Sequence, residues 1–171
     1  MNTMSELADL SSHPLAEQFP CRAPVWWGRY GHVEKDPFLR GVSGRKIMLR
    51  VPKQFGRVER VLARLLRAPK EVRRPLDSMN SLLWELADGS RTFADICEIM
   101  NATFHEAIAP VMHRTAAAIS VFQAQNLMLV LEAPLEKRWS IGPGLTPSHQ
   151  HLEPLDQDLD IDVLPLADEA P

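Results

Sequence analysis

The chain has 171 residues, of which 45% are hydrophobic, and its formal net charge is −3. This length is typical of one domain with tails, and the hydrophobic content is sufficient for a core. No apolar run approaches the roughly 18 residues of a membrane span, so we expect no membrane-spanning helix. Residues 1–19 contain acids and no basic region, which argues against a secretory signal. With two cysteines and no CxxC pair, the sequence predicts a protein of the reducing cytoplasm.

The small net charge hides a strong asymmetry along the chain. Residues 151–171 carry seven acids and no Lys or Arg, and the remaining 150 residues hold 19 basic against 15 acidic residues. Residues 45–74 contain eleven basic residues and two acids. The sequence therefore has a basic middle and an acidic end, which could meet within one chain or between two.

The N-terminal part shows no sustained hydrophobic period. Residues 1–24 are predicted to form a flexible arm with at most one helical turn. Trp26, Trp27 and Tyr30 follow as a short aromatic patch. This patch either packs on a sheet edge or a neighbouring subunit, or anchors a partner, because Trp and Tyr are favoured in binding hot spots.

Two strands with an insertion between them come next. The strand candidates are Lys46–Val51, bounded by Gly44 and Pro52, and Val72–Leu76. Between them, residues 56–68 predict an amphipathic helix. Its apolar face holds Val58, Val61, Leu62, Leu65 and Leu66, and its basic face holds Arg57, Arg60, Arg64 and Arg67. Such a helix packs on its own domain, contacts an acidic partner or second subunit, or binds nucleic acid or an anionic membrane.

Local signals then predict three helices. Asp77 is a good N-cap for a helix whose apolar face is Met79, Leu82, Leu83 and Leu86, and Gly89 can take the left-handed conformation that ends it. Thr92 with Asp95 resembles a capping box and opens a second helix over 93–100. Pro110 suits the first turn of a third helix, which Asn126 ends. Residues 127–132 are predicted to be a strand or wing, and 134–171 a Pro-rich, then acidic, largely disordered tail.

The stretch from residue 76 to residue 92 carries a resemblance to a known family. Its Leu76-Asp77, Trp84, Asp88-Gly89 and Thr92 resemble the signature of the PqqD-like family. That family includes the RiPP recognition element, a peptide-binding domain serving ribosomally made, modified peptides. The resemblance covers about residues 45 to 132, roughly half of the chain. This sequence has Asn80 and Asn126 at positions where relatives commonly carry Gly.

The resemblance implies an α+β fold of winged helix-turn-helix shape, in which a small antiparallel sheet packs on three helices. Residues 25–133 would form this domain, with the amphipathic helix 56–68 inserted between strands. In the family, leader peptides add as a strand in the groove between the third strand and the third helix. On this chain these elements are residues 71–76 and 111–125. The implied peptide-binding residues are Val72, Arg73, Arg74, Leu76, Arg114, Ala118 and Gln125.

Arg73 and Arg74 suit an acidic peptide, since Arg offers forked donors to carboxylates. The alternative is that they are solvated edge charges that discourage aggregation. Asp77, Trp84, Asp88, Gly89 and Thr92 are structural signature positions, with Trp84 expected in the core.

Catalytic chemistry is not expected from this sequence. Its six histidines do not share metal-ligand spacing, and it has no phosphate loop and no GxSxG. We therefore expect no catalytic residue, metal ligand or cofactor. The leading hypothesis is a non-catalytic module that binds a precursor or leader peptide and presents it to a radical-SAM or other peptide-modifying enzyme.

Two alternatives come from other functional classes. One is a winged-helix regulator that binds nucleic acid, which is disfavoured because the third helix carries Arg114 as its one Arg and no Lys. The other is an adaptor that forms a homodimer or larger oligomer through the insertion helix and the tail.

Overall fold

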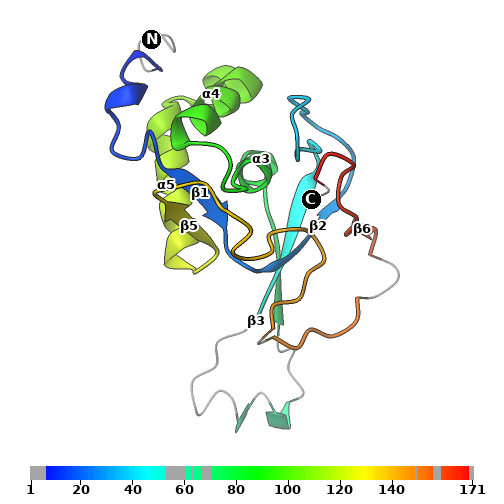
Figure 1. The fold of residues 1–171 in the computed structure, drawn as a ribbon. Helices are drawn as coiled ribbons and strands as arrows, with labels where there is room; N and C mark the ends of the chain where they lie inside the picture. Colours follow the sequence, from blue (N-terminus) through cyan, green and yellow to red (C-terminus); the bar gives the residue numbers. More distant parts are fainter. Residues whose placement is uncertain are drawn as a thin grey trace.

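The structure is a computed structural model that describes residues 7–52, 61–62, 64–66, 71–148, 150–155 and 159–169. It confirms the α+β class, with a small antiparallel sheet packed on three helices (Figure 1). The helices are α3 (Ser78–Leu86), α4 (Phe93–Phe104) and α5 (Val111–Ala124). Helix α3 contacts both strand β3 (Lys46–Pro52) and α4, so it lies between the sheet and the helical layer. The winged-helix arrangement stays a prediction.

The main sheet has the strand order β4-β3-β2-β6, and every pairing in it is antiparallel. Strands β2 (Trp26–Tyr30) and β4 (Glu71–Pro75) flank β3, and β6 (Ile161–Asp162) pairs with β2. A separate ribbon joins β1 (Phe19–Arg22) to β5 (Met128–Leu131), which follows α5. The strands predicted at 46–51, 72–76 and 127–132 are therefore confirmed.

Local capping explains where α3 and α4 begin. The Asp77 carboxylate accepts a hydrogen bond from the Asn80 amide at 2.8 Å, which satisfies an orphan donor in the first turn of α3. Thr92 and Asp95 form the complete capping box of α4, in which each side chain accepts from the other residue's backbone amide. Asn126 follows α5 with a φ of 57°, as its left-handed tolerance allows.

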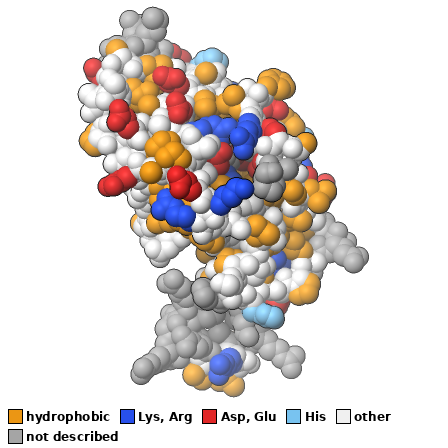
Figure 2. Space-filling model, in the orientation of Figure 1, with side chains coloured by type: hydrophobic (Ala, Val, Ile, Leu, Met, Phe, Trp, Pro, Cys, Tyr) orange, Lys and Arg blue, Asp and Glu red, His pale blue; other side chains and the backbone are white. Residues whose placement is uncertain are grey.

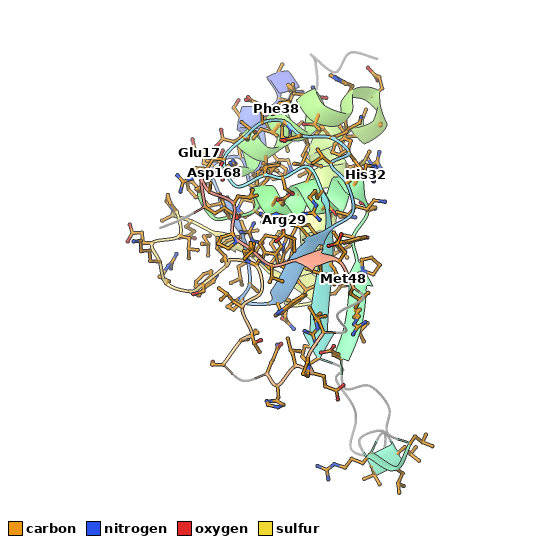
Figure 3. The ribbon with its side chains drawn as sticks, turned by 90° about the vertical axis from the view of Figure 1, so that its right-hand side faces the viewer. Glu17, Arg29, His32, Phe38, Met48 and Asp168 are labelled. Atoms are coloured by element: carbon orange, nitrogen blue, oxygen red, sulfur yellow. The ribbon has the colours of Figure 1, made fainter. Side chains whose placement is uncertain are left out.

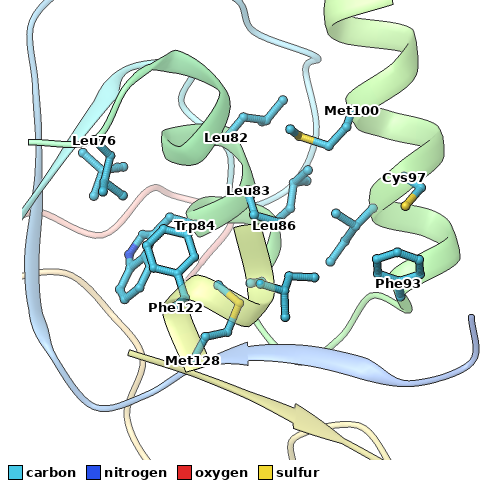
Figure 4. Close-up of a cluster of buried hydrophobic side chains, with 14 of the residues drawn as sticks. Leu76, Leu82, Leu83, Trp84, Leu86, Phe93, Cys97, Met100, Phe122 and Met128 are labelled. Carbon is cyan, nitrogen blue, oxygen red and sulfur yellow. The ribbon is translucent and has the colours of Figure 1, made fainter. Parts of the chain in front are cut away.

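The core lies between the sheet, the three helices and the β1-β5 ribbon (Figure 4). Trp84 is fully buried, as predicted, and its ring lies 6.4 Å from the Trp27 ring and 5.8 Å from the Phe122 ring. These edge and tilted contacts are the arrangements that aromatic pairs favour. Trp84 thus joins α3 to β2 and α5.

The description of residues 1–24 as a flexible arm is corrected for residues 7–24. The backbone carbonyls of Ala16 and Gln18 accept hydrogen bonds from the first amides of α4, and β1 pairs with β5. The aromatic patch is strand β2, which lies inside the sheet with Trp27 fully buried, rather than packing on a sheet edge. Both segments are ordered by partners far away in the sequence, so a search for local period does not detect them.

The prediction of a largely disordered tail is corrected in the same way. Gly144 donates its amide to the Trp27 carbonyl, and the Trp139 ring N–H donates to the Arg22 carbonyl. Farther along, β6 pairs with β2. The described tail residues therefore pack on the domain, where they contact β1 and β2.

The predicted insertion helix, 56–68, falls largely outside the described residues. Of its described part, residues 61–62 and 64–65 are helical, and they lie beyond the ends of β3 and β4 (Figure 1). Val61, Leu62, Leu65 and Leu66 are between 51% and 76% exposed. The described apolar side chains therefore do not pack on the domain, which was one of the three readings of this helix.

Candidate peptide-binding surface

Strand β4 is one edge of the four-stranded sheet. It pairs with β3 from Glu71, opposite Pro52, to Pro75, opposite Met48. Within the described residues, no strand pairs with its outer side. An exposed edge presents backbone donors and acceptors to which an extended peptide can add.

Helix α5 presents a row of side chains on the same side of the molecule. Arg114, Ala118, Val121 and Gln125 follow the i, i+4, i+7, i+11 spacing of one helical face. Val121 is 51% exposed, which makes it an apolar contact available to a partner. Arg114 reaches back over α3, where its guanidinium lies 3.9 Å from the Met79 sulfur.

One hydrogen bond joins the strand to the helix. The Arg74 guanidinium donates to the side-chain carbonyl of Gln125. Val72, on the same face of β4 as Arg74, is 41% exposed. We refer to these six positions together as the β4–α5 surface: Val72, Arg74, Arg114, Ala118, Val121 and Gln125.

Two residues assigned to peptide binding by the resemblance do not belong to this surface. Successive side chains of a strand point to opposite faces, so Arg73 projects away from Arg74 and α5. It lies opposite Arg50, on the sheet face that also holds Trp26. Leu76 is 6% exposed and belongs to the core. Of the two arginines, Arg74 alone is placed to meet a peptide lying along α5.

The signature residues hold the helical layer together. Asp88 accepts hydrogen bonds from the Ser90 amide and hydroxyl and from the Arg91 guanidinium, which closes the turn between α3 and α4. Gly89 has a φ of 78°, and a Cβ there would lie 2.7 Å from the Leu135 side chain. A larger residue at position 89 would therefore be both strained and crowded. These two positions shape the turn between α3 and α4 and its contact with Cys21 and Leu135.

A second polar cluster lies between β2 and α3, and sequence reasoning missed it. Arg29 of β2 and Glu85 of α3 are both 1% exposed, and the Arg29 Nε lies 2.8 Å from the Glu85 Oε2. Glu85 also accepts from the amide and the hydroxyl of Ser43. On its other side, Arg29 pairs at 2.9 Å with Glu169 from the C-terminal segment. The signal in the sequence was a carboxylate inside the apolar run Leu82–Leu86.

The electrostatics of this cluster follow from burial and from its partners. Burial raises the pKa of Glu85, against the opposing effect of Arg29. Burial alone would lower the pKa of Arg29, but the Glu169 and Glu85 carboxylates more than offset it and raise that pKa. Burial lowers the pKa of nearby Arg22 to about 10. Arg22 and Arg29 each lie 4.8 Å from the centre of the Trp27 ring, so two guanidinium groups pack against one tryptophan.

Neither the surface nor the cluster has the geometry of a metal centre. In the described part of the chain, no three His, Cys, Asp or Glu side chains lie close enough to hold a metal ion. None of the helices in the described ranges has the length and hydropathy needed to cross a bilayer. Acidic and basic side chains are interspersed on the face drawn in Figure 2, which does not resemble an extended basic surface.

Comparisons with known proteins identify no similar protein or family. No protein-family model matches the sequence, and searches of curated proteins and of solved structures give no significant match. The function of the chain is therefore inferred from its signature residues and its own geometry.

Proposed function

We propose that this protein is a non-catalytic peptide-binding module. It takes up an extended segment of a precursor or leader peptide as an additional strand on β4. The observation that carries the proposal is the sheet edge at β4, joined to the exposed face of α5 by the bond between Arg74 and Gln125. The resemblance of residues 76–92 to PqqD-like proteins supports the same function.

The chemistry of the β4–α5 surface indicates what kind of peptide would bind. Val72 and Val121 offer apolar contacts. Arg74 and Arg114 place two positive charges on the same side of the molecule. Main-chain pairing with β4 would supply affinity, while alternate side chains of the peptide would meet these residues. An extended peptide that combines aliphatic and acidic residues fits this surface best.

The bound peptide would then be presented to a separate modifying enzyme, of radical-SAM or another peptide-modifying class. This role follows from the resemblance and requires no catalytic residue of the chain. The described part of the insertion does not cover β4, because it lies beyond the end of the strand (Figure 1). The described part of the insertion thus leaves a peptide held on β4 accessible to a modifying enzyme.

The test is a fluorescence-anisotropy titration with labelled precursor peptides encoded beside the gene. We expect saturable binding to the wild-type chain and at least tenfold weaker binding to Arg74→Glu and Val121→Glu, because both add a negative charge where an acidic peptide would lie. Matched controls are Arg138→Glu, at an exposed tail position, and Leu129→Glu, at a site that is 44% exposed on β5. Both controls should bind as the wild type does.

Strand addition itself is tested with the same peptides N-methylated at every second residue. One set of peptides is methylated at the odd positions and the other at the even positions. Methylation removes amide donors, and only one of the two sets loses the donors that face β4, so only that set should lose binding. Absence of saturable binding to the wild type, or equal binding by all four variants, would refute the proposed function.

The adaptor alternative is favoured by one observation, the exposure of Val61, Leu62, Leu65 and Leu66. Apolar side chains gathered on one short segment are a common feature of interaction surfaces. The nucleic-acid alternative gains no comparable support from α5, in which Arg114 is the one Arg or Lys.

A further inference from the structure

The acidic C-terminal segment occupies the other edge of the sheet. In the four-stranded sheet, β6 is the edge strand next to β2, with Ile161 opposite Tyr30 and Asp162 opposite Arg29. The segment then continues past Leu164 to Glu169 along the loop before β3 (Figure 1). Residues 161–162 thus pair with β2 as an added peptide strand would, and residues 163–169 continue along the loop beside it.

Gly28 leaves room on β2 for the C-terminal segment. It stands in the middle of the strand, where glycine weakens a sheet and commonly marks a place of close approach. A Cβ at this position would overlap the side chain of Ile161 and would lie 3.2 Å from the Asp162 carbonyl and 3.3 Å from Cγ1 of Val163. All three neighbours belong to the C-terminal segment, so the missing side chain serves this segment.

The carboxylates of the segment each meet a donor. Asp162 pairs with Arg45 at 3.1 Å. Glu169 pairs with the buried Arg29 at 2.9 Å. The Asp168 carboxylate accepts a hydrogen bond from the Gly41 amide at 3.3 Å (Figure 3 labels Asp168 and Arg29). Two arginines and a backbone amide therefore recognise three acids in an extended segment, and charge-assisted contacts of this type are strong and selective.

The β2-β6 ladder is short enough for the C-terminal segment to exchange with another peptide. Only two residue pairs form the β2-β6 ladder, and Ile161 and Asp162 remain half-buried. Arg29 has a second carboxylate partner in Glu85, so it keeps a counter-ion when Glu169 leaves. A tethered segment of this size holds its place chiefly through its high effective concentration.

We propose that the edge of β2 is a second peptide-binding site, selective for extended acidic segments. Residues 161–169 are its resident ligand, and a partner segment of the same chemistry displaces them. The recognised pattern is an aliphatic residue over Gly28, an acid beside Arg45, and a further acid that reaches Arg29. This site is separate from the β4–α5 surface and does not depend on the function proposed for it.

The experiment uses the full chain and a fluorescein-labelled synthetic peptide with the sequence of residues 159–169. In a chain carrying Asp162→Asn and Glu169→Gln the resident segment is weakened, so the peptide should bind at least tenfold more tightly than to the wild type. Adding Gly28→Ala to that chain should abolish binding, because the new methyl group occupies the place of Ile161. Gly142→Ala is the matched control, since its Cβ would make an ordinary contact of 3.6 Å with Leu145.

Hydrogen exchange of residues 161–169 in the otherwise wild-type chain provides an independent readout. Gly28→Ala should speed their exchange, and Gly142→Ala should leave it unchanged. The proposal is overturned if the peptide binds the wild type and the Asp162→Asn, Glu169→Gln chain equally, or if it binds neither. It is also overturned if Gly28→Ala leaves both peptide binding and hydrogen exchange unchanged. Arg74→Glu, added to the Asp162→Asn, Glu169→Gln chain, should leave binding of the 159–169 peptide unchanged. A failure of the β2 site can therefore be distinguished from a failure of the β4–α5 surface.

Discussion

The substitution Glu85→Gln tests whether the buried charge cluster stabilises the contact between β2 and α3. Glu85 accepts from Arg29 and from both donors of Ser43, so its two oxygens act as acceptors only, as those of a carboxylate do. The amide of Gln keeps these contacts only when its oxygen accepts from the Arg29 Nε and the Ser43 amide while its NH2 donates to the Ser43 hydroxyl, and it brings no negative charge to the buried guanidinium. It would also leave Arg29 with one carboxylate instead of two.

The expected size of the effect follows from burial. Removing one partner of a buried ion pair costs about 3–5 kcal/mol, and we expect about 3 kcal/mol because Glu169 still pairs with Arg29. For a chain of this length, the melting temperature falls by about 2–4 °C per kcal/mol, which gives about 6–12 °C. Glu169→Gln should cost less, about 1 kcal/mol, since its side chain is 14% exposed and Glu85 stays in place.

Urea denaturation followed by tryptophan fluorescence measures these differences in the free energy of unfolding. The control is Glu98→Gln on the exposed face of α4, which should stay within about 0.5 kcal/mol of the wild type. A double-mutant cycle of Glu85→Gln with Arg29→Gln isolates the coupling between the two charges. A loss below about 1 kcal/mol for Glu85→Gln, or one no larger than that of Glu169→Gln, would refute this reasoning.

Two further predictions concern a helix cap and the insertion. Thr92→Ala removes the side-chain acceptor of the α4 capping box and should destabilise the chain by about 1 kcal/mol in the same urea assay, whereas Thr92→Ser should restore most of that loss; equal stability of the two variants would contradict this role. Leu65→Glu, at a position that is 75% exposed, should lower the self-association measured by light scattering over a range of concentrations, while Leu145→Glu, at 49% exposure, should not. A wild-type chain that stays monomeric at every concentration would remove the adaptor alternative.

Part of the candidate site was predictable because its determinants are local. Asp77 and Thr92 carry the caps of α3 and α4 in their own side chains, and the run before Asp77 predicts the strand that became β4. The spacing of Arg114, Ala118 and Gln125 places them on one helical face in the sequence itself. The same alternation rule, applied to Arg73 and Arg74, would have placed these two arginines on opposite faces of the sheet.

The roles of the two ends of the chain were decided by tertiary structure alone. Residues 19–22 become a strand because β5 pairs with them, and residues 161–162 become one because β2 does. Residues 19–22 have no hydrophobic period of their own. The alternation from Leu159 to Val163 permits a strand but does not specify its partner, so in both segments the pairing depends on residues more than a hundred positions away. The cluster of Arg29, Glu85 and Glu169 likewise joins three distant segments.

The sequence by itself therefore determined the helices, their caps, the strand beside them and the acidic character of the tail. These features depend on backbone propensity and on side chains within a few residues of one another. Tertiary structure decided which sheet edge is covered, which arginines lie beside one another and where the acids of the tail bind. Those outcomes depend on long-range pairing and on the burial of charge, which exist only after the chain has folded.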